Sequence, residues 1–264
     1  MEISSFTNNK VKYLRSLYQK KYRRKEDKFV LEGVKIIEEA LEEQVRLEAI
    51  FYSDYLSRNR RGRRLLDRLE ESQIELVKLT DDLLQQIADT VSPQGVLAIA
   101  NKVNYETQIL SGSDRLILIV DRVQDPGNLG TIIRTADAAG VDGIIMTKGT
   151  VSLYNQKTIR ATMGSLFRVP ILKENDLDEL LKCLKEEQIS LVVADVDGED
   201  YHFEVDYNQA IAIIVGNEGV GPREELLVGA DKKIKIPLTG GAESLNVAMA
   251  TGIIIYEAVR QRLG

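Results

Sequence analysis

Residues 115–140 read RLILIVDRVQDPGNLGTIIRTADAAG, and this stretch decides the fold. Its apolar run, 116–120, is bounded by charged residues and is followed by the turn formers Asp125, Pro126 and Gly127. This pattern predicts a buried strand that runs into a turn. In an open α/β sheet such a turn lies at the carboxyl end of the strand, where ligands tend to bind.

A helix is expected directly after the turn. Asn128 is a candidate for its N-cap, because an asparagine side chain can accept a hydrogen bond from a backbone N–H of the first helical turn. An apolar stripe at helical spacing predicts the buried side, and polar residues share the other side. The stripe consists of Ile132, Ile133, Ala136 and Ala139, and the polar side of Thr131, Arg134 and Thr135.

Strand and helix signals alternate regularly from residue 115 to the C-terminus. The expected strands are 116–120, 143–147, 169–172, 191–194, 211–215 and 233–236. The alternation predicts an α/β fold with a mostly parallel sheet that is covered by helices on both faces. A last helix from about Ser244 is apolar nearly all round, so it is expected to lie against the sheet, a partner subunit or both.

The first hundred residues predict a second, smaller α/β module. Its expected elements are helices at 9–24, 33–43, 65–69 and 80–88 and strands at 28–31, 47–52, 74–79 and 95–100. A polar stretch containing Ser-Gly-Ser separates the two modules. We therefore expect three parts: a basic N-terminal domain over 1–100, a linker over 101–114 and a larger domain over 115–264.

Composition restricts the class of protein. With 29% charged and 44% hydrophobic residues the chain is expected to be soluble and globular rather than disordered. No apolar run is long enough to span a bilayer and no signal peptide is evident, so the cytoplasm is expected and a membrane is not. The single Cys183 and single His202 provide no Cys/His cluster, and no metal site is expected.

Positive charge is concentrated at the N-terminus. Residues 1–28 hold nine Lys or Arg against three acids, although the whole chain has a net charge of −6. Phosphate binding depends on such local clusters, and the tyrosines at 13, 18 and 22 could add stacking. A solvated helix face is the alternative, but a second arginine cluster at 58–68 favours RNA contact. The expected RNA-binding residues are Lys10, Lys12, Arg15, Arg23, Arg24, Arg61 and Arg63.

Two further stretches place glycines after strands. Residues 211–221, IAIIVGNEGVG, run from a buried strand into a glycine-rich turn with one carboxylate, Glu218. The glycine order is neither a dinucleotide fingerprint nor a P-loop. Residues 234–246, IKIPLTGGAESLN, combine a strand, a glycine loop and a helix start, where Ser244 could simply be an N-cap.

Together these motifs resemble a known family. NLGTIIRTADAAG (128–140), IVGNEGVG (214–221) and IPLTGGAESLNVAMA (236–250) closely resemble the three motifs of the SpoU (TrmH-like) family of RNA ribose 2′-O-methyltransferases in the SPOUT superfamily. RATMGSLFRVP (160–170) resembles a further segment of that family. FVLEGVKIIEEAL (29–41) and QGVLAIA (94–100) resemble, more loosely, its ribosomal-protein-like RNA-binding domain. The resemblance implies a deep trefoil knot in the C-terminal domain, although knots are almost absent from proteins.

The same resemblance implies an activity and a site. The expected reaction transfers a methyl group from S-adenosylmethionine to a ribose 2′-hydroxyl, in ribosomal RNA rather than transfer RNA, by a homodimer. The family's functional positions fall on Asn128, Arg134, Glu218, Ser244 and Asn246. Its cofactor positions fall on Gly216, Asn217, Glu218, Gly219, Ile236, Leu238 and Leu245.

Arg134 has two interpretations. In the family it is proposed to activate the hydroxyl, yet a guanidinium is a poor base and binds phosphate more readily. The alternative is a surface ion pair with Asp137. For the whole chain, a base-methylating SPOUT enzyme and a non-catalytic RNA-binding protein of the same fold are the rival classes.

Overall fold

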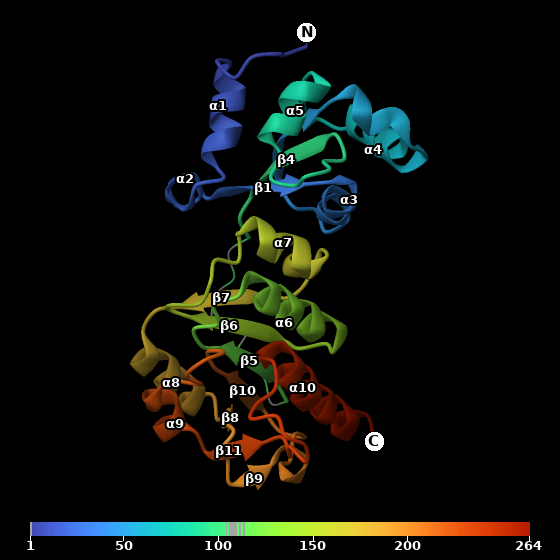
Figure 1. Ribbon diagram of the computed structural model, residues 1–264. Coiled ribbons are helices and arrows are strands. Elements are labelled where there is room, and N and C mark those ends of the chain that lie inside the picture. The colour runs from blue at the N-terminus through green and yellow to red at the C-terminus, as the bar shows by residue number, and fades with distance from the viewer. Residues whose placement is uncertain (1, 104, 106–109, 111, 113) are drawn as a thin grey trace. The chain divides into compact units, whose positions relative to one another are not determined.

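The computed structural model describes residues 2–103, 105, 110, 112 and 114–264. The chain divides into two compact units, 1–103 and 104–264. Each unit is an α/β fold around its own sheet (Figure 1). The expected linker, 101–114, lies partly outside the described residues, and Asn101 at its start belongs to the last strand of the N-terminal unit.

The N-terminal unit combines helices with a mixed four-stranded sheet. Its elements are α1 (Asn9–Ser16), α2 (Lys20–Glu26), β1 (Lys28–Glu32), α3 (Val34–Glu42), β2 (Leu47–Tyr52), η1 (Asp54–Arg58), α4 (Arg60–Glu70), β3 (Glu75–Lys78), α5 (Asp81–Ile87) and β4 (Val96–Asn101). The strand order is β1-β4-β2-β3. β4 is antiparallel to both of its neighbours, whereas β2 and β3 are parallel.

The prediction of a single helix over 9–24 is wrong, because the chain forms two helices there. α1 ends at Ser16, and Leu17 turns fully into the core before α2 begins at Lys20. The arginine-rich stretch also differs from expectation, since it belongs to α4 itself instead of preceding it. Asn59 caps that helix by accepting a hydrogen bond of 2.9 Å from the Gly62 N–H.

The C-terminal unit holds the longer sheet. Its elements are β5 (Leu116–Val120), α6 (Pro126–Ala138), β6 (Gly143–Thr147), α7 (Gln156–Thr162), η3 (Ser165–Phe167), β7 (Ile171–Glu174), α8 (Leu177–Glu186), β8 (Ser190–Ala194), β9 (Asp200–Tyr201), η4 (His202–Glu204), β10 (Ile211–Val215), α9 (Glu224–Gly229), β11 (Lys232–Lys235) and α10 (Val247–Leu263).

Its seven strands lie in the order β7-β6-β5-β10-β8-β11-β9, and every pair is parallel. Helices α8 and α9 cover one face, and α6 and α10 cover the other, with α7 packed against α6 (Figure 1). β5, β6 and β10 have completely buried side chains, as the continuous apolar runs predict for strands covered on both faces. The predicted α/β class with a parallel sheet is therefore confirmed.

α6 begins earlier than expected and has a different cap. Pro126 occupies its first turn, where a missing N–H costs nothing, and the Asp125 carboxylate accepts a hydrogen bond of 2.9 Å from the Asn128 N–H. Asn128 is thus a helical residue, and the predicted N-cap is wrong. Gly130 lets α6 cross α7 closely, because a Cβ there would stand 2.3 Å from the Cβ of Ala161.

The last helix and the edge of the sheet also depart from the sequence prediction. α10 begins at Val247, and Asn246 rather than Ser244 caps it. One side of α10 is not covered within the described chain: Met249, Ile253 and Tyr256 are 61%, 37% and 50% exposed, and we call them the exposed apolar face of α10. β9, which the sequence patterns do not predict, is a two-residue strand at one edge of the sheet.

Candidate active site

The predicted motifs meet at the carboxyl edge of the parallel sheet. The turn after β5 leads into α6, and the glycine-rich loop of residues 216–222, which we call the glycine loop, follows the neighbouring strand β10. The segment 236–246 follows β11 and leads into α10. Carboxyl ends of parallel strands share one edge, which explains why segments distant in sequence converge here.

Glu218 joins the glycine loop to the start of α6. Its carboxylate accepts hydrogen bonds from the backbone N–H groups of Gln124 and Asp125, at 3.0 and 3.1 Å, and from the side-chain amide of Asn128, at 3.0 Å. Partial burial raises the pKa of Glu218, but these donors outweigh it and hold the pKa below its ordinary value. Glu218 is therefore an ionised anchor whose two oxygens are both engaged.

Asn128 extends this network to the last helix. Its side-chain oxygen accepts a hydrogen bond of 2.9 Å from the Asn246 amide. The Asn246 oxygen in turn caps α10 by accepting from the N–H groups of Ala248 and Met249. One continuous chain of hydrogen bonds thus links Glu218, Asn128 and Asn246, and fixes the side-chain amide orientations of both asparagines.

Arg134 and Ser244 remain apart from this network. Both are exposed, and neither side chain makes a hydrogen bond or an ion pair with another described residue. The alternative interpretation of Arg134 is wrong, because Asp137 pairs with Arg168 instead, at 2.8 Å. Arg134 follows Asn128 by six residues, so it lies about 9 Å further along α6 and about 120° around it.

The predicted cofactor residues belong to two loops of different character. The glycine loop is tightly built, since the Asn217 side chain accepts from the Gly219 and Val220 N–H groups and donates to the Arg122 carbonyl at 2.9 Å. Gly216 is required there, because a Cβ would stand 2.0 Å from the Pro222 nitrogen. The second loop, which holds Leu238 and Leu245, is open.

In that second loop, residues 237–245 are exposed and make no hydrogen bond with another described residue. Their backbone N–H and C=O groups therefore remain accessible to a ligand. Ile236, directly after β11, is half-buried, whereas Leu238 and Leu245 are 38% and 37% exposed. Exposed apolar side chains beside open backbone groups are the features that a nucleoside site needs.

Sequence reasoning missed the roles of Gln124 and Asp125. Their backbone N–H groups hold Glu218, and the Asp125 carboxylate both caps α6 and pairs with Lys157 at 3.1 Å. The hydrogen bond from the Asn128 N–H, followed by the one from Lys157, lowers the pKa of Asp125. An aspartate directly before a proline is a helix-start signal that could have identified this cap.

The predicted RNA-binding residues of the N-terminal unit differ in their exposure and in the partners of their charged groups. Lys12 and Arg24 are exposed and have no partner among the described residues. Three others are exposed but engaged: Lys10 pairs with Glu75, Arg61 pairs with Glu38, and Arg63 donates to the Ser57 carbonyl. Arg15 is also exposed, with its guanidinium 4.7 Å from the ring centre of Phe6.

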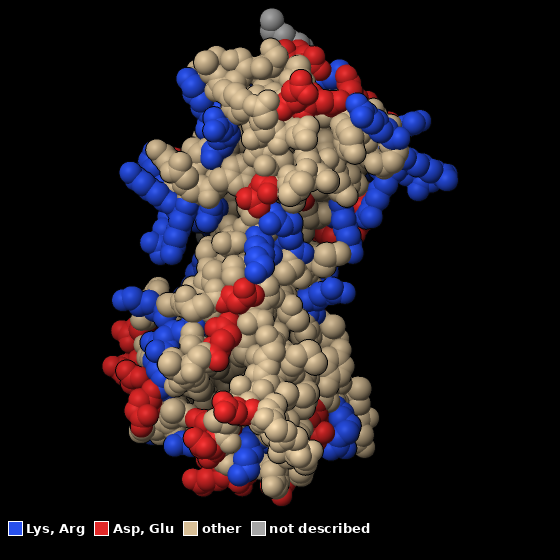
Figure 2. All heavy atoms as spheres, viewed as in Figure 1, with Lys and Arg blue, Asp and Glu red and all other residues tan. Residues whose placement is uncertain are grey.

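Arg23 contradicts the sequence prediction, because it is 7% exposed. Its guanidinium donates to the carbonyls of Leu17 and Tyr18 at the end of α1, and burial lowers its pKa. The predicted stacking role of the three tyrosines is also unsupported, since Tyr13, Tyr18 and Tyr22 pack against the core. In Figure 2, Lys and Arg side chains gather over α1 and α2 and over α4 of this unit.

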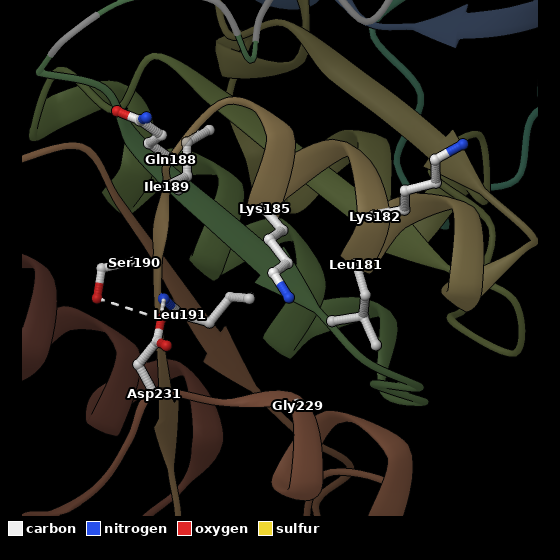
Figure 3. A pocket seen from close by; sticks show the side chains of 9 residues that line it. All are labelled: Leu181, Lys182, Lys185, Gln188, Ile189, Ser190, Leu191, Gly229 and Asp231. Atoms are coloured by element: carbon white, nitrogen blue, oxygen red, sulfur yellow. Dashed lines mark hydrogen bonds between the residues drawn. The ribbon is translucent and has the colours of Figure 1, made fainter.

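A surface pocket of about 730 Å³ lies elsewhere on the C-terminal unit. Figure 3 shows it between α8, β8 and the segment after α9, with the Lys185 side chain extending between Leu181 and Leu191. No predicted site residue lines it. Its position gives it no part in the network around Glu218.

Two kinds of feature are absent from the part of the chain that the structure describes. None of the described helices is both long and apolar enough to cross a membrane. No group of three or more His, Cys, Asp or Glu residues within the described ranges could hold a metal ion.

Comparison with known proteins agrees with this geometry. The SpoU rRNA methylase family matches residues 115–256, and the MRM3-like substrate binding domain matches residues 8–98. A 23S rRNA guanosine 2′-O-methyltransferase of Bacillus subtilis is 36% identical, over 97% of this chain and 98% of the relative. A 23S rRNA uridine 2′-O-methyltransferase of Streptomyces viridochromogenes is 31% identical, over 89% of this chain and 83% of the relative.

Solved structures give the same result. The crystal structure of an S-adenosylmethionine-bound rRNA methyltransferase from Sinorhizobium meliloti has a TM-score of 0.89 and 32% identity, and the match covers 100% of this chain and 99% of that chain. The family's two domain models match the two compact units in turn. The chain therefore belongs to the SpoU rRNA methylase family.

Proposed function

We propose that the protein transfers a methyl group from S-adenosylmethionine to a ribose 2′-hydroxyl of large-subunit ribosomal RNA. The observation that carries the proposal is the hydrogen-bonded chain of Glu218, Asn128 and Asn246, which joins the three family motifs at one edge of the sheet. The relatives act on the 2′-oxygen of 23S rRNA, on guanosine in one case and uridine in another. The ribose, rather than one base, is the shared target.

The residues fit S-adenosylmethionine. The glycine loop is fixed by the hydrogen bonds of Asn217 and Glu218, and Gly216 keeps its backbone close to Pro222. Residues 237–245 leave backbone donors and acceptors open beside Leu238 and Leu245. In our proposal Gly216, Asn217, Glu218, Gly219 and Ile236 contribute the remaining contacts, mostly through their backbone.

S-adenosylmethionine supplies an activated methyl group on a sulfonium, and the protein must align the hydroxyl with it. Glu218 is poorly suited to act as the base, because three donors already occupy its carboxylate. Arg134 has no partner among the described residues, so its guanidinium can clamp the phosphate beside the reacting ribose and stabilise negative charge on the oxygen. The hydroxyl proton then leaves to phosphate or solvent. Ser244, exposed at the open loop, is available to contact the substrate.

We further propose that the N-terminal unit holds the RNA. Lys12 and Arg24 are the freest cations among its predicted RNA-binding residues, and Lys10, Arg15, Arg61 and Arg63 add positive charge while keeping partners in the protein. Such clusters bind RNA through phosphate contacts and counterion release. This arrangement would let an acidic chain bind a polyanion.

A homodimer with shared active sites is the expected working form. The exposed apolar face of α10 needs a cover, and a twofold arrangement is the commonest one. Within one chain Arg134 lies on a different side of α6 from Asn128, which favours a site completed by the partner's arginine. The deep trefoil knot is a further proposal, supported by the contacts that tie the segments after β5, after β10 and before α10 together. The cytoplasmic location stays a prediction.

The reaction can be tested directly. Purified protein would be incubated with radiolabelled S-adenosylmethionine and unmodified 23S rRNA, and the product would be digested to nucleosides. Label in a 2′-O-methylribonucleoside supports the proposal, whereas label on a base assigns the chain to the base-methylating class. Transfer to tRNA but not to 23S rRNA would replace the substrate, and cofactor-independent RNA binding without transfer would indicate a non-catalytic protein.

A further inference from the structure

A completely buried carboxylate lies at the end of β5, outside the predicted site residues. Asp121 is 0% exposed and accepts hydrogen bonds from two other segments of the chain and from its neighbour Arg122. The Thr147 hydroxyl donates to it at 2.6 Å, and the Arg223 N–H at 3.0 Å. The guanidinium groups of Arg223 and Arg122 lie 2.7 and 3.2 Å from its oxygens.

Arg223 is the residue that makes this cluster unusual. It directly follows the glycine loop and is the N-cap residue of α9. Besides Asp121, its guanidinium donates to the Lys148 carbonyl at 2.9 Å and to the Thr147 hydroxyl at 3.2 Å. One carboxylate and one guanidinium thereby connect the carboxyl ends of the adjacent strands β5 and β6 to the far end of the glycine loop that follows β10.

The pair has a clear consequence for the glycine loop. The loop is anchored at its start by β10 and in its middle by Asn217 and Glu218, and Arg223 fixes its other end. A buried ion pair is often no more stabilising than well-packed apolar side chains, so stability alone does not explain a charged pair here. The directional contacts of a guanidinium do define a geometry.

We propose that Asp121 and Arg223 are positioning residues for S-adenosylmethionine: they hold the glycine loop in the conformation that binds the cofactor. Neither residue needs to touch the cofactor itself. The inference rests on the proposed function, because it assumes that the glycine loop is part of the cofactor site. It assigns a role to two residues outside the predicted site set.

The chain offers a matched control at the opposite edge of the same sheet. There Asp142 binds the Arg115 guanidinium at 2.7 Å and accepts the Leu116 N–H at 2.8 Å, so an aspartate again joins an arginine side chain to a backbone N–H, here without a second arginine. This pair joins the amino ends of β5 and β6, away from both loops. Arg115→Lys and Arg223→Lys therefore change the same chemistry at two places.

Calorimetric titration of the full-length protein with S-adenosylmethionine, together with thermal unfolding, tests the proposal. A lysine at either place keeps the charge but cannot donate in several directions at once. Both variants should lower Tm by a few degrees, and only Arg223→Lys should raise the Kd for the cofactor, by about tenfold. In steady-state assays its KM for the cofactor should rise while its KM for RNA stays unchanged.

The proposal is overturned if the Kd of Arg223→Lys stays within twofold of the wild type, or if Arg115→Lys weakens binding equally. If Arg223→Lys does not fold, Thr147→Val carries the test: it removes the hydroxyl between Asp121 and Arg223 and should raise the Kd about threefold, and an unchanged Kd again overturns the proposal. Failure of the wild-type protein to bind the cofactor would instead refute the proposed function.

Discussion

Asn128→Asp changes one contact of the central network and leaves the other in place. The substitution is isosteric, and an aspartate oxygen can still accept the hydrogen bond from Asn246. The contact with Glu218 changes from attractive to repulsive, because the amide donor 3.0 Å from the Glu218 carboxylate is replaced by a second carboxylate. The variant therefore tests whether this hydrogen bond organises the site.

The cost can be worked out from that geometry. Two unit charges about 4 Å apart repel by about 1 kcal/mol in water and about 4 kcal/mol at an effective dielectric constant of 20. Since Glu218 is exposed, solvent screening favours the low end, about 1 to 2 kcal/mol, and the lost hydrogen bond adds about 1 kcal/mol. A total of about 2 to 3 kcal/mol predicts a loss of about 30- to 150-fold in methyl transfer at pH 8.

This loss should be relieved at lower pH. Repulsion between the two carboxylates raises the pKa of the pair, and a proton taken up between them restores an O–H donor. The defect is full above that pKa and disappears as the pH falls through it. Activity of Asn128→Asp relative to the wild type should thus rise several-fold between pH 8 and about pH 5.5.

Asn128→Ala is the control, because it removes the same hydrogen bond without adding a charge. Its activity relative to the wild type should be independent of pH. Methyl transfer to 23S rRNA, measured for all three proteins across the pH range, distinguishes the two outcomes. If activity relative to the wild type depends on pH in the same way for both variants, the hydrogen bond between Asn128 and Glu218 does not organise the site.

Three further predictions concern other parts of the chain. Arg24→Gln should lower RNA affinity and reduce the slope of log affinity against log salt concentration by about 0.7 to 0.9, with Tm unchanged. Arg23→Gln should instead lower Tm, because Arg23 is buried. Equal effects of the two substitutions on Tm would contradict this prediction. Hydrogen bonds from Arg260 lower the pKa of Glu257 from 4.5 to about 2. The wild type should therefore be more stable than Glu257→Gln above about pH 4.5, and this difference in stability should disappear as the pH falls toward 2. A difference in Tm that persists at pH 2 would refute the proposed ion pair between Glu257 and Arg260. Met249→Glu, on the exposed apolar face of α10, should convert a dimer into monomers in light scattering, and an unchanged mass would place the dimer interface elsewhere.

Local patterns predict the sheet of the C-terminal unit well. The strands at 116–120, 143–147 and 211–215 agree to the residue, because continuous apolar runs between turn formers leave little choice. β9 escapes prediction because a two-residue strand has no periodicity to detect. The cap of α6 is misassigned because Asp125 and Asn128 are both capping residues, and the proline between them is the deciding signal.

Tertiary placement is beyond local patterns. Asn128 meets Glu218 and Asn246 through contacts that span 90 and 118 residues of sequence, and only the family resemblance brings these residues together in advance. Arg23 is predicted to bind RNA, but its side chain is buried. In a run of basic residues nothing in the sequence distinguishes this arginine from its exposed neighbour Arg24. The role of Asp121 is hidden because an aspartate after a strand usually forms a turn.

The short edge strand β9 has a consequence for self-association. An exposed sheet edge presents unpaired backbone groups that can recruit strands of other molecules and lead to aggregation. At this edge only Asp200 and Tyr201 are in strand conformation, and η4 begins directly after them. A strand of another molecule could therefore form very few backbone hydrogen bonds with β9. Copies of this protein are therefore discouraged from joining sheet to sheet at the β9 edge.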